Sequence, residues 1–287
     1  MRSSSTPIPK RHHFVPIMLL ENFVDAEGWL HIHRRQNPVI GVHRVRPNNA
    51  FLESDLYNLI NIDGHRDPTL ERQLSIIEGV VADIFGQIIT EARQGKAPSL
   101  SPQEIEQVLI YQHLQWKRTP DVQRGVTSDV EGFQMMDKLL AELEAKFPNR
   151  TAEIASFRQV ENQRRILHNA RVGSVTSLSS EALSAMRSRG LAIMHITARN
   201  KQFIIASQPM LKLTRPGRTH LADPVVELWF PIAPDVAIGL GTGRGKPTLW
   251  PMPDSSWLRS FNRGLAEQSS SFAAGSPNLI RSLANPR

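Results

Sequence analysis

The hydrophobic periodicity of the chain changes near residue 190, and this change constrains the fold more than any other feature of the sequence. Before it, from Asp67 to about Ala170, apolar residues recur at three- and four-residue spacing, which is typical of amphipathic helices. After it, from Leu191, short apolar runs are separated by Pro and Gly, which is typical of strands. Separate helical and strand regions indicate an α+β fold.

Three parts are therefore predicted: a small N-terminal β element, a helical middle and a C-terminal antiparallel sheet. The N-terminal element rests on the alternation in Trp29-Leu30-His31-Ile32-His33. Asp67-Pro68 and the capping box Ser101-Pro102-Gln103-Glu104 each start a helix. Further helices are expected at about 128–146 and 151–170, strands at 191–196, 202–206, 225–230 and 236–240, and finally a helix near 256–267 with a Ser-rich tail.

The length of 287 residues and the hydrophobic content of 40% suit one large domain or two modest ones. We interpret residues 10–287 as a single α+β domain with a helical subdomain over 101–170, after a flexible leader at 1–9. The chain has no cysteine, which excludes disulfides and cysteine metal sites and favours the cytoplasm. No uninterrupted apolar run reaches the roughly 20 residues needed to cross a bilayer, so no membrane partner is expected.

The net charge of +7 is concentrated in one segment of the chain. Residues 150–220 hold 12 Lys and Arg against 3 Asp and Glu, whereas residues 1–149 hold 16 against 19. Such a surplus attracts polyanions, and it predicts nucleic acid as a partner of the 150–220 segment. The alternative is a solvated basic face with no dedicated ligand.

Several common catalytic signatures are missing from the sequence. It has no Gly-x-x-x-x-Gly-Lys loop, no Gly-x-Gly-x-x-Gly fingerprint, no His-Glu-x-x-His pair and no Gly-x-Ser-x-Gly elbow. Their absence argues against P-loop nucleotide hydrolases, dinucleotide oxidoreductases and serine esterases. His31-x-His33 puts two imidazoles on one strand face, a spacing that metal sites use, but a third ligand is not evident nearby.

Two adjacent imidazoles, His12 and His13, follow two cations near the N-terminus. Successive side chains of an extended segment point to opposite faces, so one His of the pair is expected to enter a given pocket. With Glu53 and Asp55, it would form the hydrogen-bonded imidazole and carboxylate cluster that general acid–base catalysis needs. In the alternative interpretation, the His pair and its carboxylate partners only hold the N-terminal segment in place.

A dense group of polar side chains ends the helix that starts at Ser101. Gln112, Gln115 and Trp116 share one face, and together with Tyr57 they are expected to line a ligand pocket. Arg118 lies beyond them and offers the planar donor fork that binds phosphate. The alternative is a capped helix end in which Trp116 belongs to the core and Arg118 satisfies helix carbonyls.

The order of these motifs resembles an uncharacterised, mainly bacterial family known as domain of unknown function 4238. The resemblance is most specific at His12-His13-Phe14-Val15-Pro16 and extends from about residue 10 to about residue 270. Further similarities are Leu20 and Phe23, Glu53-x-Asp55-x-Tyr57, Ile77-Glu78, Arg118-Thr119-Pro120 with Arg124, Phe203-Ile204 and Phe230-Pro231-Ile232-Ala233-Pro234. The family implies no reaction.

The chain also departs from the family pattern. Where the family shows Gln, an aromatic and a basic residue after the first motif, this chain has Ile17, Leu19 and Glu21. Where the family shows Ser-Asp-Asn-Pro at a later strand end, this chain reads Ala206-Ser207-Gln208-Pro209, so Ser207 replaces an Asp. If that Asp is catalytic in relatives, this chain is impaired or uses another residue.

The leading functional prediction is a nucleic-acid-directed phosphodiesterase or ribonuclease-like hydrolase, with a role in bacterial toxins or phage defence. His12 or His13 would transfer protons, and Glu53 or Asp55 would orient the imidazole or hold a divalent metal ion. Arg118, Arg124 and Lys117 would bind phosphate. The alternatives left open are a non-catalytic module that binds nucleic acid or protein and has a structural His cluster, and a small-molecule hydrolase.

Overall fold

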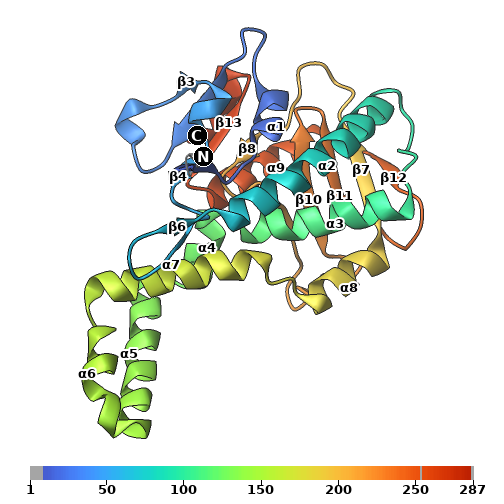
Figure 1. Cartoon of the computed structure of the whole chain (residues 1–287). Coiled ribbons are helices and arrows are strands. Elements are labelled where there is room, and N and C mark those ends of the chain that lie inside the picture. Colours follow the sequence, from blue (N-terminus) through green and yellow to red (C-terminus); the bar gives the residue numbers. More distant parts are fainter. Residues whose placement is uncertain (1–8, 253, 286–287) are drawn as a thin grey trace, which may run out of the picture.

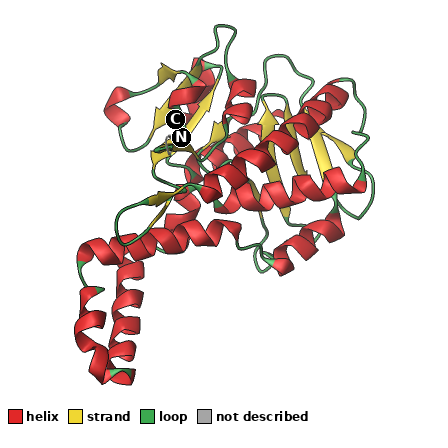
Figure 2. Ribbon diagram, viewed as in Figure 1, coloured by secondary structure: helices red, strands yellow, loops and turns green. Residues whose placement is uncertain are grey.

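The computed structural model describes residues 9–252 and 254–285 and confirms the predicted α+β architecture (Figures 1 and 2). Small strands come first, helices occupy residues 69–189, and a mostly antiparallel sheet follows. Residues 1–8 of the predicted leader lie outside the described residues.

The N-terminal segment is built from short strands and single helical turns. β1 (Arg11–His13) pairs antiparallel with β4 (Leu52–Ser54), and this pairing places His12 opposite Glu53. Pro16 precedes a short helix, and Pro38 and Pro47 each begin a 3₁₀ turn, in agreement with the preference for Pro at the first helical position. The remaining elements here are α1 (Ile17–Leu20), the 3₁₀ turns Glu21–Phe23, Pro38–Ile40 and Pro47–Asn49, and the hairpin of β5 (Leu59–Ile60) with β6 (Arg66–Asp67).

A four-stranded sheet joins the two ends of the chain. Its order is β3-β2-β13-β8, so β13 lies between β2 and β8 and pairs antiparallel with both. The Ser-rich stretch after residue 267 was predicted as a tail, and this prediction is wrong for residues 271–284, because they form a strand and a helix. The elements are β2 (Leu30–Arg34), β3 (His43–Val45), β8 (Ile205–Ala206), β13 (Ser271–Ala274) and α10 (Pro277–Ala284), which packs on β2 and β13.

The helical middle begins with two long helices that pack against each other. The predicted capping box forms as expected: the Ser101 hydroxyl accepts from the Glu104 amide, and the Glu104 carboxylate accepts from the Ser101 amide. A second box at Ser128 and Glu131 starts the first helix of the arm described below. The helices are α2 (Thr69–Arg93), α3 (Pro102–Lys117), α4 (Pro120–Val126), α5 (Asp129–Lys146), α6 (Thr151–Ser156), α7 (Val160–Thr176) and α8 (Ser180–Arg189), with a 3₁₀ turn at Pro148–Arg150.

A five-stranded sheet in the order β12-β7-β11-β10-β9 forms the centre of the body. Its pairings are antiparallel except that of β12 with β7, which is parallel. α2 contacts β7 and β10, and α3 lies beside α2 (Figure 1). The elements are β7 (Leu191–His195), β9 (Leu211–Leu213), β10 (Glu227–Ala233), β11 (Val236–Leu240), β12 (Thr248–Pro251) and α9 (Ser255–Gln268), which contacts strands of both sheets.

The described residues bury two separate apolar clusters. The larger one unites both sheets with α2, α3, α8, α9 and α10. The smaller one, formed by Met136, Leu140 and Ile154 with Phe157, Ile166 and Leu167 packed against it, belongs to α5, α6 and the first half of α7. These elements project from the body as an arm (Figure 1). The predicted helical subdomain over 101–170 thus divides, because α3 belongs to the larger cluster.

Among the described residues, one helix, α2, is long and apolar enough to cross a membrane. Its acidic and basic residues interrupt the apolar run, which is why the sequence shows no continuous span. In this fold, Leu74, Val81, Phe85 and Ile88 of α2 are buried in the larger cluster. The same apolar composition therefore suits a core helix.

Candidate functional site

His12 is buried, and both of its ring nitrogens bond to the backbone. Nδ1 accepts from the Tyr57 amide at 2.8 Å, so Nε2 carries the proton that it donates to the Pro9 carbonyl at 3.0 Å. The ring stacks on that of Tyr57, with 5.6 Å between centroids. Burial lowers the pKa of His12, which favours the neutral form. The predicted acid–base role for His12 is not supported, because neither nitrogen is free to exchange a proton.

His13, the next residue of β1, is partly buried. Its Nε2 atom is buried and has no hydrogen-bond partner among the described residues. Burial lowers the pKa of His13 as well. Its backbone carbonyl accepts from Arg118 Nη2 at 3.0 Å, so the residue's clearest contact is made by its main chain.

The two predicted carboxylates pair with arginines and not with His12. Asp55 has a φ of +57° and accepts from Arg66 Nε at 2.6 Å and from Asn58 Nδ2 at 3.0 Å. The Arg66 guanidinium holds the pKa of Asp55 below its usual range. Glu53 forms an ion pair with Arg124. The hydrogen-bonded imidazole and carboxylate cluster that the sequence suggested is therefore absent among the described residues at His12.

Arg118, predicted to bind phosphate, is 2% exposed and fully engaged within the protein. Nη1 pairs with Glu78 at 2.6 Å, Nη2 bonds the His13 carbonyl and Nε lies 3.4 Å from the Phe14 carbonyl. The Tyr57 hydroxyl donates to the Arg118 carbonyl at 3.0 Å. Arg118 therefore fastens β1 to α2 and α3 and offers no donor to a phosphate. We call His12, Tyr57, Glu78 and Arg118 the buried anchor.

Glu71, which sequence analysis missed, borders the buried anchor. Burial raises its pKa to about 7; Arg118 opposes this change, and Glu78 adds to it. The carboxyl group therefore exchanges its proton near neutral pH. No described imidazole forms a hydrogen bond with it, so Glu71 does not form the imidazole and carboxylate cluster expected from the sequence.

The predicted pocket at the end of α3 does not form as one space. Gln115 is buried and donates to the Phe14 carbonyl at 2.7 Å, and the buried Gln112 amide has no partner among the described residues. Trp116 packs against the larger apolar cluster. Lys117 donates to the Ser177 carbonyl and lines a separate cavity beside α4, α5 and α7. These side chains support packing and face different surroundings.

The charged side chains that do converge surround Arg124. Two small cavities of about 200 and 230 Å³ share Arg124 and Glu53 in their walls, and we call them together the Arg124 cleft. Arg164, Arg171, Asp129 and His168 line the first cavity, and Arg34, Asp121 and Ser270 line the second. The cleft thus unites β4, α4, α7 and the ends of β2 and α9, which are far apart in sequence. Of the predicted phosphate-binding residues, Arg124 alone lies here.

His168 is the imidazole that lines the Arg124 cleft, and sequence analysis missed it. Its Nε2 donates to the Asn58 carbonyl at 2.8 Å, and no described residue bonds to its Nδ1. A carbonyl on Nε2 leaves Nδ1 unprotonated in the neutral ring, so Nδ1 can accept a proton. Nearby Arg164 is exposed and has no ion pair with any described residue. No motif spacing marks these two positions, because α7 reads as an ordinary charged helix.

Ser207, where the resemblance implied an Asp in relatives, lies beside the Arg124 cleft. The buried Ser207 hydroxyl donates to Asp121 Oδ2, and the Ser270 amide donates to the same oxygen at 2.9 Å. Ser207 Oγ also accepts from the Ser271 amide at 3.1 Å. The carboxylate of Asp121, which belongs to α4, therefore lies at this position next to Ser207.

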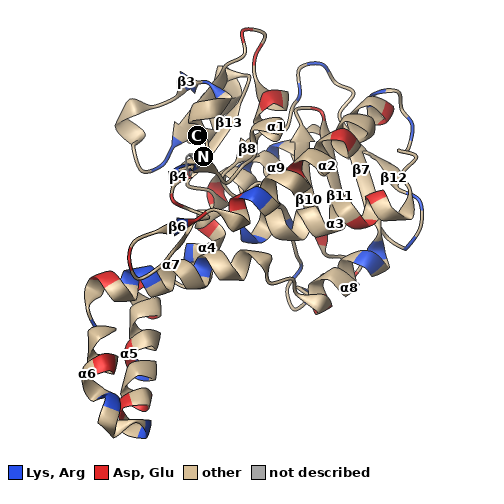
Figure 3. Ribbon diagram, viewed as in Figure 1, with Lys and Arg blue, Asp and Glu red and all other residues tan. Residues whose placement is uncertain are grey.

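The basic 150–220 segment is distributed over α7, α8 and the following strands (Figure 3). Arg158 pairs with Glu144, Arg187 with Glu106 and Arg218 with Asp223. Arg189 is buried among backbone carbonyls. The surplus charge of this segment is thus partly neutralised by ion pairs.

The described residues contain no group of three or more His, Asp or Glu side chains able to hold a metal ion. His31 bonds Asp25 at 3.0 Å, whereas His33 packs on Phe272, so the two do not converge. Glu53 and Asp55 likewise have separate arginine partners. The divalent metal considered from the sequence has no evident site in the described parts of the chain.

The model of the family described as protein of unknown function DUF4238 matches the chain over residues 11–278. The chain belongs to the DUF4238 family. No curated protein and no solved structure matches it. The DUF4238 model covers both the buried anchor and the Arg124 cleft.

Proposed function

We propose that this DUF4238 protein binds nucleic acid, with phosphate groups entering the Arg124 cleft. The observation that carries the proposal is that Arg124 lines both cavities of the cleft, with Arg164 in the wall of one cavity and Arg34 in the wall of the other. Three distant segments of the chain thus each contribute an arginine to the cleft. Arginine binds phosphate through its planar donor fork, and backbone phosphates supply most of the affinity for nucleic acid. A location in the bacterial cytoplasm and a role in toxins or phage defence belong to the same proposal.

Arg124 is the residue expected to change partner when phosphate binds. In the described structure its guanidinium pairs with Glu53, and both side chains are partly exposed at 51% and 34%. Exposed ion pairs contribute little stability, so the exchange of Glu53 for a phosphate costs little. Arg164 adds a guanidinium that has no carboxylate partner among the described residues.

The test is fluorescence anisotropy with labelled single-stranded RNA and DNA of about 12 nucleotides, a length within common site sizes. Arg34→Ala/Arg164→Ala should weaken binding by about tenfold and lower the salt slope by about 1 for each phosphate that the variant no longer binds. The matched control is Arg199→Ala/Lys201→Ala, which removes two charges of the basic segment at a cavity beside β7 and the loop before β11. Equal weakening by both double variants would contradict binding at the cleft.

Cleavage of RNA is a second candidate function, favoured by the free Nδ1 of His168. This atom would take the proton of a ribose 2′-hydroxyl, whose oxygen would attack the adjacent phosphorus. The 5′-oxygen would leave with a proton from solvent, giving a 2′,3′-cyclic phosphate and a 5′-hydroxyl end. Arg124 and Arg164 would stabilise the charge on the phosphorus-bound oxygens.

The cleavage test uses labelled RNA and DNA on a denaturing gel, with and without Mg²⁺ or Mn²⁺. Wild-type protein should cut RNA, His168→Gln should bind RNA without cutting it, and His12→Gln should cut it at temperatures where the variant is folded. No cleavage by wild type, with RNA binding intact, would leave binding as the function.

A further inference from the structure

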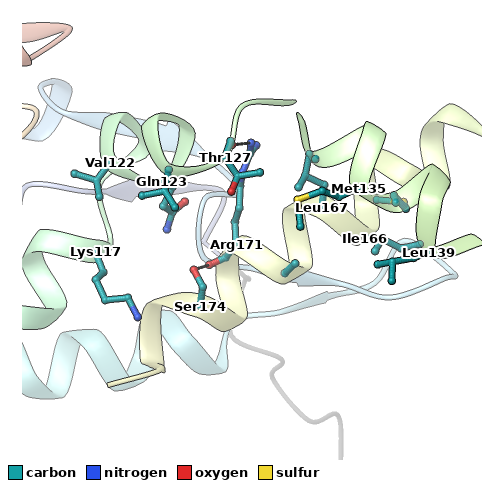
Figure 4. A pocket seen from close by; sticks show the side chains of 14 residues that line it. Lys117, Val122, Gln123, Thr127, Met135, Leu139, Ile166, Leu167, Arg171 and Ser174 are labelled. Carbon is teal, nitrogen blue, oxygen red and sulfur yellow. Dashed lines mark hydrogen bonds between the residues drawn. The ribbon is translucent and has the colours of Figure 1, made fainter. Parts of the chain in front are cut away.

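The arm and the body enclose a second, mainly aliphatic cavity of about 460 Å³ between α4, α5 and α7. Met135, Leu139, Ile166 and Leu167 form one end of it, and Lys117 lies at the other end, with the stem of Arg171 between them (Figure 4). No aromatic ring is among its lining residues. Nucleobases are bound mainly by stacking on aromatic rings, so this cavity suits a flexible aliphatic chain better than a base.

Large apolar side chains at this cavity remain exposed in the described structure. Met135 is 59% and Leu139 is 56% exposed, although each lies on a helix that packs against the arm's own cluster. Methionine and leucine at such a surface fit an unbranched chain closely, because methionine adapts its shape to its partner. Contiguous exposed apolar area of this kind marks a binding surface.

The charges at the cavity are all positive. Lys117 and Arg171 are the charged residues in its wall, with no Asp or Glu among the lining residues. Lys117 donates to the Ser177 carbonyl and has no carboxylate partner among the described residues, and burial lowers its pKa. Arg171 pairs with Asp129, but its Nε atom is buried without a partner. A partly desolvated ammonium next to aliphatic side chains favours a ligand with an anionic head.

We propose that this cavity binds a free, single-chain fatty-acid carboxylate. The carboxylate pairs with Lys117, and the alkyl chain runs along α5 and α7 toward Leu139 and Ile166. The ligand covers Met135 and Leu139 and supplies the anion that the cavity lacks. This site adjoins the Arg124 cleft, with which it shares Gln123, Leu167 and Arg171, but it does not depend on nucleic-acid binding.

The experiment is isothermal titration calorimetry of the full chain with dodecanoate below its critical micelle concentration. Wild type should bind one equivalent, and dodecyltrimethylammonium, which has the same chain and the opposite charge, should not bind. Lys117→Met should weaken binding at least tenfold, whereas Lys138→Met, which removes an exposed lysine of α5 outside the cavity, should change it less than twofold.

A second matched pair tests the apolar end. Leu139→Asp should abolish binding, whereas Leu143→Asp, one turn further along α5 and 42% exposed but outside the cavity wall, should bind as wild type does. Circular dichroism and thermal unfolding establish that each variant is folded. If Leu139→Asp does not fold, the Lys117 pair still decides the question.

Several outcomes would overturn the proposal. They are no binding of dodecanoate by wild type, equal binding by Lys117→Met, and equal binding of the cationic amphiphile. Sedimentation that shows a wild-type dimer, dissociated by Leu139→Asp, would assign the cavity to a second copy of the chain. Binding to anionic vesicles without binding of free dodecanoate would assign it to a membrane surface.

Discussion

The buried anchor and the Arg124 cleft contain the same kinds of side chain, an imidazole, a carboxylate and an arginine, but these side chains have different partners. In the anchor, His12 and Arg118 bond to backbone carbonyls, an amide and Glu78, and both are buried. In the cleft, His168 has a free Nδ1, and Arg164 has no carboxylate partner among the described residues. Side chains whose hydrogen-bonding groups all have partners within the protein indicate a structural role. Side chains that line a cavity and keep hydrogen-bonding groups free indicate a ligand-binding site.

Removing Arg118 should have the largest effect on stability. Arg118→Met leaves Glu78 and the His13 carbonyl without their buried donor, and we expect a loss of about 3–5 kcal/mol in the free energy of unfolding. Urea denaturation followed by circular dichroism measures it. The control is Arg150→Met, whose exposed ion pair with Glu153 should contribute little to stability because solvent screens it. Similar losses in both variants would show that the anchor does not depend on Arg118.

Replacing His12 should lower stability without changing function. His12→Ala leaves the buried Tyr57 amide without its acceptor, which costs about 1–3 kcal/mol, whereas the Pro9 carbonyl keeps the donor Asn58 Nδ2 at 2.9 Å. We expect the variant to bind RNA with wild-type affinity at a temperature where it is folded. Weaker RNA binding by a folded His12→Ala protein would show that the buried anchor contributes to function.

The same residue predicts a pH dependence. Because the folded-state pKa of His12 is lowered, the unfolded chain binds protons first, and stability falls as pH decreases below the unfolded pKa of about 6.5. His12→Gln should reduce this loss between pH 7.5 and pH 5. Thermal unfolding across that range, compared with wild type, measures the difference, and an unchanged slope would mean that other histidines determine it.

An Asp at position 207, the residue that the family resemblance implied there, should place two carboxylates together beside the cleft. Ser207→Asp buries a second acid against Asp121, and we expect a loss of about 2 kcal/mol at pH 7 that diminishes in acid as one group is protonated. Ser207→Asp/Asp121→Ser, which exchanges the two residues, should recover most of the stability. Recovery in the melting temperature would support the view that α4 has taken over the carboxylate. If Ser207→Asp leaves the stability unchanged, the view that α4 supplies the carboxylate at this position is contradicted.

Glu71 should give the smallest effect, with the opposite pH dependence. Its folded pKa is raised to about 7, so the folded state holds the proton more tightly, and stability falls as pH rises from about 4.5 to 7. Glu71→Gln should remove this loss and stabilise the protein by about 1 kcal/mol at pH 8, since partial exposure reduces the contribution. Glu142→Gln, an exposed change on α5, is the control and should show no such gain.

The sequence predicted the elements whose signals are local. Periodicity located α2, the capping box at Ser101 located the start of α3, the helix expected at about 128–146 matches α5, and the run 236–240 matches β11. The helix expected at 151–170 is divided in the structure by the turn at 157–159, because α6 and α7 pack at an angle across the small cluster of the arm. β13 was missed because a four-residue strand in a Ser-rich stretch lacks a periodic signal.

The candidate site was less predictable because its contacts join distant segments. The sequence analysis grouped His12 with Glu53 and Asp55 as a hypothetical acid–base cluster, and β1 does pair with β4. It could not show that backbone groups occupy both ring nitrogens of His12. Asp121 and Ser207 meet across 86 positions, and His168 reaches Asn58 across 110. Only tertiary structure brings such residues together.

The position of β13 has a consequence for synthesis of the chain on the ribosome. β2 and β8 are made long before residues 271–274, and until those residues emerge each has an unpaired edge. The four-stranded sheet can therefore form completely only late in translation. A chain that stops before β13 leaves β2 and β8 with unpaired backbone groups. Premature termination in this short segment should yield aggregates in place of a slightly shortened protein.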